Sequence, residues 1–198
     1  MIIEKVTHDS YRHQLLKRII RPLHLKNLFY RAHRYPPSVT NREPAGYYAT
    51  RMPPGLLPLF GRDVSRTTLS WTQGAGGIIA TTHAMTVWEQ ALYHGRLLPR
   101  QQMQELRSLV SIKTGQPIKR TTVADPQGFG LGVAQLTQPQ IGRFWFYEGE
   151  TLGFRTLHVY LPKTGVIFAT GLNSHPGTDH IGALAVAVYK TLHARGLA

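Results

Sequence analysis

Three runs of β-branched and aromatic residues in the last third of the chain constrain the fold more than any other feature. They are Phe144–Tyr147, Phe154–Leu161 and Val166–Leu172, and turn-forming residues separate them. Such runs are typical of consecutive antiparallel strands. The segment Pro162-Lys163-Thr164-Gly165 predicts a tight turn between the second and third strands. The sequence therefore predicts a three-stranded meander that forms the floor of a sheet.

Helical patterns occupy much of the rest of the chain. They predict helices at residues 1–7, 9–20, 85–92, 101–110 and 181–192. Asp9 or Ser10 is expected to cap the second helix, Thr81 or Thr82 the third, and Thr178 or Asp179 the last. Residues 31–70 are rich in Pro, Arg and Tyr and show no sustained period, which predicts a long irregular segment.

This order of elements predicts an α+β fold in one domain of 198 residues. We expect residues 1–125 to form a helical, loop-rich lobe. We expect residues 126–198 to form the antiparallel meander, with the C-terminal helix packed on the sheet.

The charge is strongly one-sided, with 23 Lys and Arg against 10 Asp and Glu and a net charge of +13. Such a balance favours anionic partners such as nucleic acid, anionic lipid or a cell-wall polymer. The basic residues are scattered and form no nucleic-acid-binding motif, so we expect a solvated basic surface rather than specific nucleic-acid recognition.

Other features exclude whole classes of chemistry. The chain has no cysteine, which excludes disulfides and thiolate catalysis. Its 10 histidines show no metal-ligand spacing, so neither a metal nor another cofactor is expected. No apolar run is long enough to span a bilayer, and residues 1–5 do not resemble the start of a signal peptide.

The meander also carries a family resemblance. Tyr147-Glu148-Gly149 is followed by Leu152-Gly153-Phe154, a strand, a Pro-x-x-Gly turn, an apolar strand and Asn173. This order resembles the serine β-lactamase and penicillin-binding-protein superfamily, in particular its class C β-lactamase, DD-peptidase and esterase branch. Two further stretches, residues 2–27 and Ala75–Gly77 with the helix after them, are similar to the same superfamily. There Gly128–Val133 would open the first strand of the sheet.

The resemblance implies a serine acyl-transfer site whose nucleophile and base lie in Ser-x-x-Lys, assisted by the Tyr of Tyr-x-Asn. None of the serines has Lys three positions later, and no Tyr-x-Asn is present. We therefore expect no catalytic residue within this chain. The Lys-Thr-Gly triplets at 113–115 and 163–165 do not hold the place of the family's third motif. We interpret them as turns, the first after a helix and the second between two strands.

By resemblance the third motif falls on Tyr147, Glu148 and Gly149, and the backbone N–H of Glu150 would be the second oxyanion donor. In the family, Lys or His at the first position provides a cationic donor for a substrate carboxylate. Tyr147 provides only a phenol, while Glu148 and Glu150 add negative charge that would repel such a substrate. Strand alternation leaves a second interpretation open, in which both glutamates face solvent or pair with nearby arginines. A glycosidase pair is disfavoured, because both carboxylates would project from one strand.

We therefore expect the C-terminal part of a serine hydrolase, acting on amides or esters through an acyl-enzyme and inactive alone. The resemblance implies a periplasmic or cell-envelope location. The alternative is a non-catalytic basic module that binds an anionic polymer or a partner chain. An unpaired sheet edge and exposed apolar side chains on the strands at 154–161 and 166–172 would favour a homo-oligomer or a complex with a missing N-terminal half.

Overall fold

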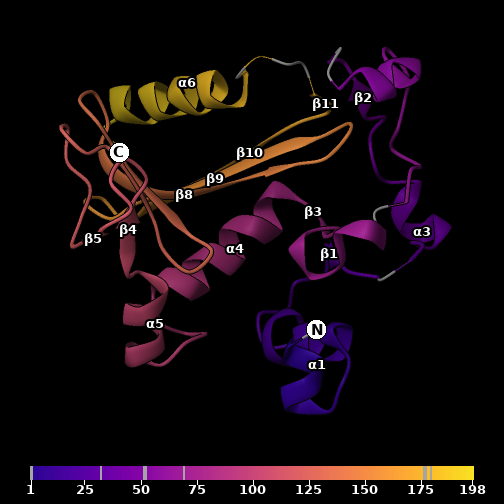
Figure 1. Ribbon diagram of the computed structural model, residues 1–198, viewed down its shortest axis with the longest axis horizontal. Coiled ribbons are helices and arrows are strands. Elements are labelled where there is room, and N and C mark those ends of the chain that lie inside the picture. The colour runs from indigo at the N-terminus through magenta and orange to yellow at the C-terminus, as the bar shows by residue number, and fades with distance from the viewer. Residues whose placement is uncertain (1, 32, 51–52, 69, 176–177, 179) are drawn as a thin grey trace. The chain divides into compact units, whose positions relative to one another are not determined.

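The computed structural model describes residues 2–31, 33–50, 53–68, 70–175, 178 and 180–198. The fold is α+β, as predicted, with a seven-stranded antiparallel sheet in the strand order β10-β9-β8-β7-β6-β4-β5 (Figure 1). The strands are β4 Leu109–Ser111, β5 Pro117–Ile118, β6 Gln127–Phe129, β7 Ala134–Gln138, β8 Gly142–Glu150, β9 Arg155–Leu161 and β10 Val166–Leu172.

The predicted meander is confirmed, because β8, β9 and β10 are consecutive neighbours in this sheet. The turn between β9 and β10 closes through the N–H of Gly165, which donates to the carbonyl of Leu161 at 2.8 Å. Gly165 has a φ of 75°, a left-handed conformation that glycine adopts without steric cost. The Lys-Thr-Gly triplet at 163–165 is therefore a turn.

The start of the sheet differs from our expectation. The strand pair β4 and β5 precedes Gly128, and the Lys-Thr-Gly triplet at 113–115 lies between these two strands rather than after a helix. The helix predicted at 101–110 is also wrong at its end, because α5 spans Arg100–Leu106 and Val110 lies in β4. The alternation of buried Leu109, exposed Val110 and buried Ser111 has the period of a strand rather than of a helix.

The other helices agree with the predicted ones. They are α1 Ile2–Thr7, α2 Tyr11–Leu15 with a π-helical turn at Leu16–Ile20, α4 Thr82–Tyr93 and α6 His180–Ala194. The Ser10 hydroxyl accepts the N–H of His13 at 3.1 Å, and the Thr81 hydroxyl accepts the N–H of Ala84 at 3.2 Å, so both are N-caps. Asp179, one of the residues expected to cap the last helix, lies outside the described residues.

The chain divides into two compact units, which are interleaved along the sequence. The first comprises residues 1–88, 149–155 and 171–179, and the second comprises residues 89–148, 156–170 and 180–198. The predicted division between residues 1–125 and 126–198 stays a prediction.

The first unit holds the irregular segment predicted at 31–70. The short elements of this unit include the helix α3 Pro37–Thr40 and 3-10 turns at Pro54–Leu59 and Ser70–Ala75. They also include two strand pairs: β1 Leu28–Phe29 is antiparallel to β3 Ile79–Ala80, and β2 Tyr47–Tyr48 is parallel to β11 Ser174–His175. Tyr48 is 1% exposed and anchors this segment.

The second unit holds a hydrophobic core made by the end of α4 and the sheet. Buried Tyr93, Leu109, Val133 and Trp145 form it, and Tyr160 packs against them. The helix α6 lies along the sheet (Figure 1), with Ile181 and Ala185 buried on its apolar face.

Exposed apolar side chains were expected on β9 and β10, and this expectation is wrong. The apolar residues of both strands are buried or half-buried. In β9 the consecutive residues Leu157, His158 and Val159 are all buried, so this strand packs on both of its faces. Among the described residues, no helix is long and apolar enough to cross a bilayer.

Candidate functional site

Tyr147–Glu150, which the resemblance predicts to hold the family's third motif, form the end of β8. The register between β7 and β8 runs from the pair Gln138 and Gly142 to the pair Ala134 and Phe146. Because β7 begins at Ala134, Tyr147–Glu150 continue past the end of β7. The strand therefore extends Tyr147 and its neighbours beyond the paired part of the sheet on this side.

Aromatic neighbours hold the Tyr147 side chain in the second unit. Its ring centroid lies 6.1 Å from that of Phe129 in an edge-on arrangement, and 6.3 Å from that of His158. The side chain nevertheless remains 41% exposed. Tyr147 thus presents its phenol at the surface, with its ring supported on two sides.

A buried acid–base pair lies behind this aromatic group. The Nδ1 atom of His158 lies 2.5 Å from Oε1 of Glu89, and the two residues are 8% and 0% exposed. Burial raises the pKa of Glu89, while the hydrogen bond and the charge of His158 act against that rise. The second oxygen, Oε2, is buried and has no hydrogen-bond partner among the described residues.

Our sequence reasoning missed this pair, although each residue carries a signal. Glu89 lies four residues after Met85 and three before Leu92, on the apolar stripe of the predicted helix. His158 lies between Leu157 and Val159 in a strand whose neighbours are buried. A charged residue at a predicted core position indicates a buried partner.

Glu150 lies in the first unit and is paired there. Its Oε2 atom lies 3.6 Å from Nε of Arg155, and Arg155 also donates through Nη1 to the carbonyl of Thr178 at 3.3 Å. For Glu150, the structure therefore shows the interpretation in which the glutamate pairs with a nearby arginine. Such a partly exposed pair lowers the negative charge that Glu150 presents to a ligand.

The Leu152-Gly153-Phe154 motif marks a place where two backbone segments touch within the first unit. A Cβ atom on Gly153 would lie 2.7 Å from both the carbonyl carbon and oxygen of Gly46, and 2.7 Å from Cγ2 of Val64. Only glycine allows this approach. A Cβ on Gly46 would in turn meet the ring of Phe154 at 2.4 Å.

Asn173 joins the same segment. Its side-chain amide donates to the carbonyl of Ala45 at 3.0 Å, and its carbonyl accepts the N–H of Tyr47 at 2.9 Å. Asp63 accepts the N–H of Gly46 at 3.1 Å, and hydrogen bonds from Ser65 lower the pKa of its carboxyl. Residues 45–48, which carried no sequence signal, are thus held by two positions of the quoted motif.

Within the part of the chain that the structure describes, no group of three or more His, Cys, Asp or Glu side chains is arranged to hold a metal ion. Several serines have structural partners instead. Ser111 donates to Oδ1 of Asp125 at 2.9 Å, and Ser108 donates to the carbonyl of Glu105 at 2.6 Å.

Comparison with known proteins defines the family. The Beta-lactamase family model matches residues 1–190, so the chain belongs to the Beta-lactamase family. Its structure is similar to that of the D-amino acid amidase from Ochrobactrum anthropi SV3 complexed with L-phenylalanine amide. The TM-score is 0.75 and the sequence identity 20%, over 99% of this chain and 54% of that chain.

Two further structures share the fold. The D-stereospecific amidohydrolase from Streptomyces sp. has a TM-score of 0.71 and 24% identity, over 87% of this chain and 46% of that chain. The penicillin binding protein from Bacillus halodurans has a TM-score of 0.59 and 17% identity, over 94% of this chain and 52% of that chain. This chain therefore spans about half the length of the structures that it matches.

Proposed function

We propose that this chain provides the third-motif strand of a serine hydrolase that cleaves amide or ester bonds through an acyl-enzyme. The observation that carries the proposal is the placement of Tyr147. It lies on β8 past the end of β7, with its phenol exposed and its ring supported by Phe129 and His158, at the position that the resemblance predicts for the first residue of the third motif. In this role the phenol O–H donates to the bound substrate. The N–H of Glu150 stabilises the developing oxyanion.

The nucleophilic serine and its lysine base lie outside residues 1–198 in this proposal. The chain holds no Ser-x-x-Lys and no Tyr-x-Asn. It spans about half the length of its structural neighbours. The 198-residue chain is accordingly expected to be inactive alone.

We favour an amidase or esterase over a β-lactamase. A β-lactam carries a carboxylate, which is best held by a cationic side chain at the first motif position. Tyr147 is neutral, and Glu148 follows it on the strand. Two structural neighbours are an amidase and an amidohydrolase, which supports an amide substrate.

The test uses covalent labelling of two proteins. The purified 198-residue chain should not react with fluorescent penicillin or a fluorophosphonate, and should not hydrolyse p-nitrophenyl acetate above background. A longer product of the same reading frame, extended upstream of Met1, should be labelled at a serine that has lysine three residues later. Stoichiometric acylation of a serine within residues 1–198 would contradict the proposal.

The role of Tyr147 is then measured in the labelled, longer protein. Tyr147→Phe removes one donor to the bound substrate and should lower kcat/KM by about tenfold. Arg143→Gln, an exposed change on the same strand, should leave kcat/KM unchanged. A Tyr147→Phe protein with full kcat/KM would exclude the phenol from substrate binding.

The second candidate is a basic module that binds an anionic polymer, and the net charge of +13 favours it. The reading frame separates the two candidates. If no Ser-x-x-Lys is encoded upstream of Met1, the serine hydrolase is excluded and the binding module remains.

A further inference from the structure

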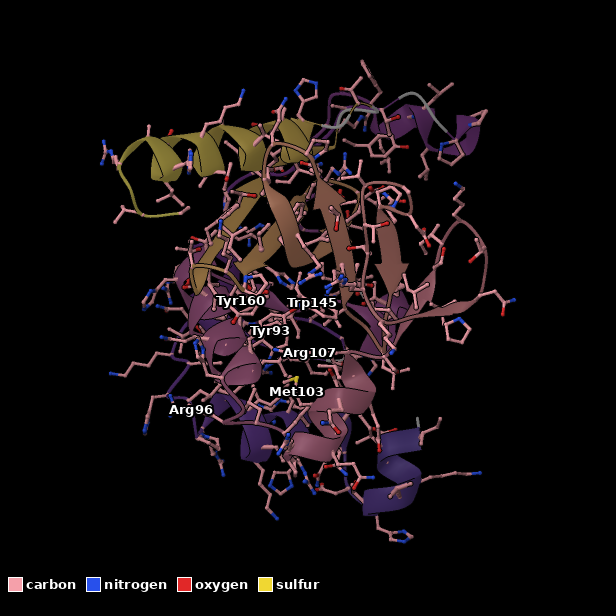
Figure 2. All side chains as sticks on the ribbon, turned by 90° about the vertical axis from the view of Figure 1, so that its left-hand side faces the viewer. Tyr93, Arg96, Met103, Arg107, Trp145 and Tyr160 are labelled. Carbon is pink, nitrogen blue, oxygen red and sulfur yellow. The ribbon has the colours of Figure 1, made fainter. Side chains whose placement is uncertain are left out.

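A hollow in the second unit takes no part in the proposed reaction. It has a volume of 610 Å³ and is formed by the end of α4, the loop that follows, and α5. Figure 2 shows Tyr93, Arg107 and Met103 gathered close to Trp145 and Tyr160, with Arg96 set apart from them. The volume falls within the range usual for small-molecule sites.

Two buried polar atoms at this hollow lack hydrogen-bond partners among the described residues. They are Oη of Tyr93, a residue that is only 7% exposed, and Nε of Arg107. Leaving a buried donor without a partner is unfavourable. Burial raises the pKa of Tyr93, so its phenol stays protonated and remains a donor. Two residues that line the hollow thus hold unmet hydrogen-bonding capacity.

The guanidinium of Arg107 is held in place without a carboxylate. It lies 5.1 Å from the ring centroid of Tyr93 and 5.7 Å from that of Trp145, and Nη2 donates to the Tyr93 carbonyl at 3.4 Å. These contacts fix the plane of the guanidinium while leaving its charge without an acidic partner among the described residues.

The lining of the hollow has a consistent chemical character. Arg100, Arg107 and His94 contribute basic groups, and no acidic side chain lies among the described lining residues. The one acidic residue of α5, Glu105, does not line the hollow and accepts a hydrogen bond from Gln101 at 3.0 Å. Leu98 and Met103 contribute apolar surface beside the ring of Tyr93.

We propose that this hollow binds a small organic carboxylate with an apolar or aromatic body. The carboxylate takes the fork geometry that guanidinium groups favour, with Arg107 as the fixed partner and Arg100 as the exposed one. The body of the ligand packs on Leu98, Met103 and the Tyr93 ring. The site stands independently of the proposed serine hydrolase, because none of Tyr147–Glu150 lines it.

The first experiment compares an acid with its neutral amide. Phenylacetate and phenylacetamide are titrated into the 198-residue chain by calorimetry, with tryptophan fluorescence followed in parallel. Phenylacetate should bind about tenfold more tightly than phenylacetamide, the difference expected for one charge-assisted hydrogen bond. Inorganic phosphate should bind more weakly than phenylacetate, because it has no apolar body. Equal affinity for acid and amide, or no binding of either, would overturn the proposal.

Matched arginine variants locate the site. Arg107→Gln should weaken phenylacetate binding by about tenfold or more, and Arg100→Gln by a smaller factor. Arg96→Gln removes the same charge from an exposed position that does not line the hollow, and should bind as the unmodified chain does. Equal weakening by Arg96→Gln and Arg107→Gln would show a nonspecific charge effect and overturn the proposal.

Arg107 also packs on two aromatic rings, so each variant is checked by circular dichroism and thermal unfolding. If Arg107→Gln does not fold, Arg100→Gln serves as the test instead, because the side chain of Arg100 is exposed. Unchanged affinity in Arg100→Gln, together with equal binding of acid and amide, would then rule out the site.

Discussion

Glu89 and His158 are two ionisable residues that the fold buries together. They lie 69 positions apart in the sequence and are joined by a hydrogen bond of 2.5 Å. A sequence pattern can indicate that each position is buried, but it cannot show which partner satisfies it, because the pairing arises only when α4 meets β9. The pair supports the ring of Tyr147 through His158, whose ring centroid lies 6.3 Å away.

The stability of the protein should depend on pH through Glu89. Burial raises the pKa of this carboxyl above its ordinary value of 4.5, so the folded protein holds the proton more tightly than the unfolded chain does. The stabilisation is complete below that ordinary value and is lost as pH rises through the higher pKa of the folded state. Glu89→Gln cannot titrate. The free energy of unfolding of the unmodified chain, relative to this variant, should therefore fall as the pH rises above 4.5, as measured by urea unfolding.

Glu105→Gln is the control, because it removes the same charge from an exposed position on α5. If the stability difference from the unmodified chain changes with pH in the same way for both variants, the change comes from net charge rather than from the burial of Glu89. The prediction would be contradicted if the free energy of unfolding of the unmodified chain, relative to Glu89→Gln, stayed constant or rose with pH. Glu89→Ala removes the carboxyl group that bonds His158, and its cost should be about 1–3 kcal/mol at low pH and should also fall as pH rises.

At the level of elements, long periodic segments could be predicted and short ones could not. The strands β8, β9 and β10 have seven to nine residues each, enough for β-branched and aromatic enrichment to identify them. The strands β4 and β5 have three and two residues, too few to show a period, and the helix prediction was extended over β4 in error. For the same reason, the short β2 strand at Tyr47–Tyr48 had no signal of its own.

The candidate site was predictable only in part. The family resemblance predicts a functional role for Tyr147–Glu150, which stays a prediction. The strand pattern predicted a strand as far as Tyr147, and the structure extends β8 to Glu150. Strand alternation could not determine the partner of Glu150, which depends on where the chain brings Arg155. The sequence also could not show why residue 153 is glycine, because the backbone that it contacts, at Gly46, is remote in sequence.

The connection between β8 and β9 should depend on the absence of a side chain at Gly153. A methyl group there would meet backbone atoms of Gly46 at 2.7 Å, and backbone cannot move aside as a flexible side chain can. Gly153→Ala should therefore lower the free energy of unfolding by about 1–3 kcal/mol or more. Thermal and urea unfolding measure the loss.

Gly171→Ala in β10 is the matched substitution. The nearest atom to its added methyl group would be the Arg155 carbonyl oxygen at 3.9 Å, an ordinary contact. Its stability should change by no more than about 0.5–1 kcal/mol in either direction. Equal losses at the two glycines would show that the approach of Gly46 to Gly153 is not a constraint.

For the whole molecule, the net charge of +13 predicts salt-sensitive binding to anionic polymers. The chain should be retained on heparin and released as salt shortens the Debye length toward about 3 Å at molar concentration. A neutral dextran matrix provides the control and should not retain the chain. Retention on heparin that is unchanged in molar salt would rule out an electrostatic origin.

Association through the sheet stays a prediction. The strand order ends at β10, which leaves one side of Val166–Leu172 as an edge of the seven-stranded sheet. Such an edge can pair with another strand. The apolar side chains of β9 and β10 are buried or half-buried rather than exposed, so they do not provide the hydrophobic contribution to association that was expected. Pairing at this edge would rest on backbone hydrogen bonds.

The interleaving of the two units limits how this sequence can be recombined with its relatives. Their boundaries fall at residues 88–89, 148–149, 155–156, 170–171 and 179–180, and the first four lie inside α4, β8, β9 and β10. Neither unit is one continuous stretch of chain, so neither can be excised or inherited alone. An exchange that breaks within the meander would combine strands from two parents inside both units at once. Residues 142–172 are therefore expected to move between family members as one block.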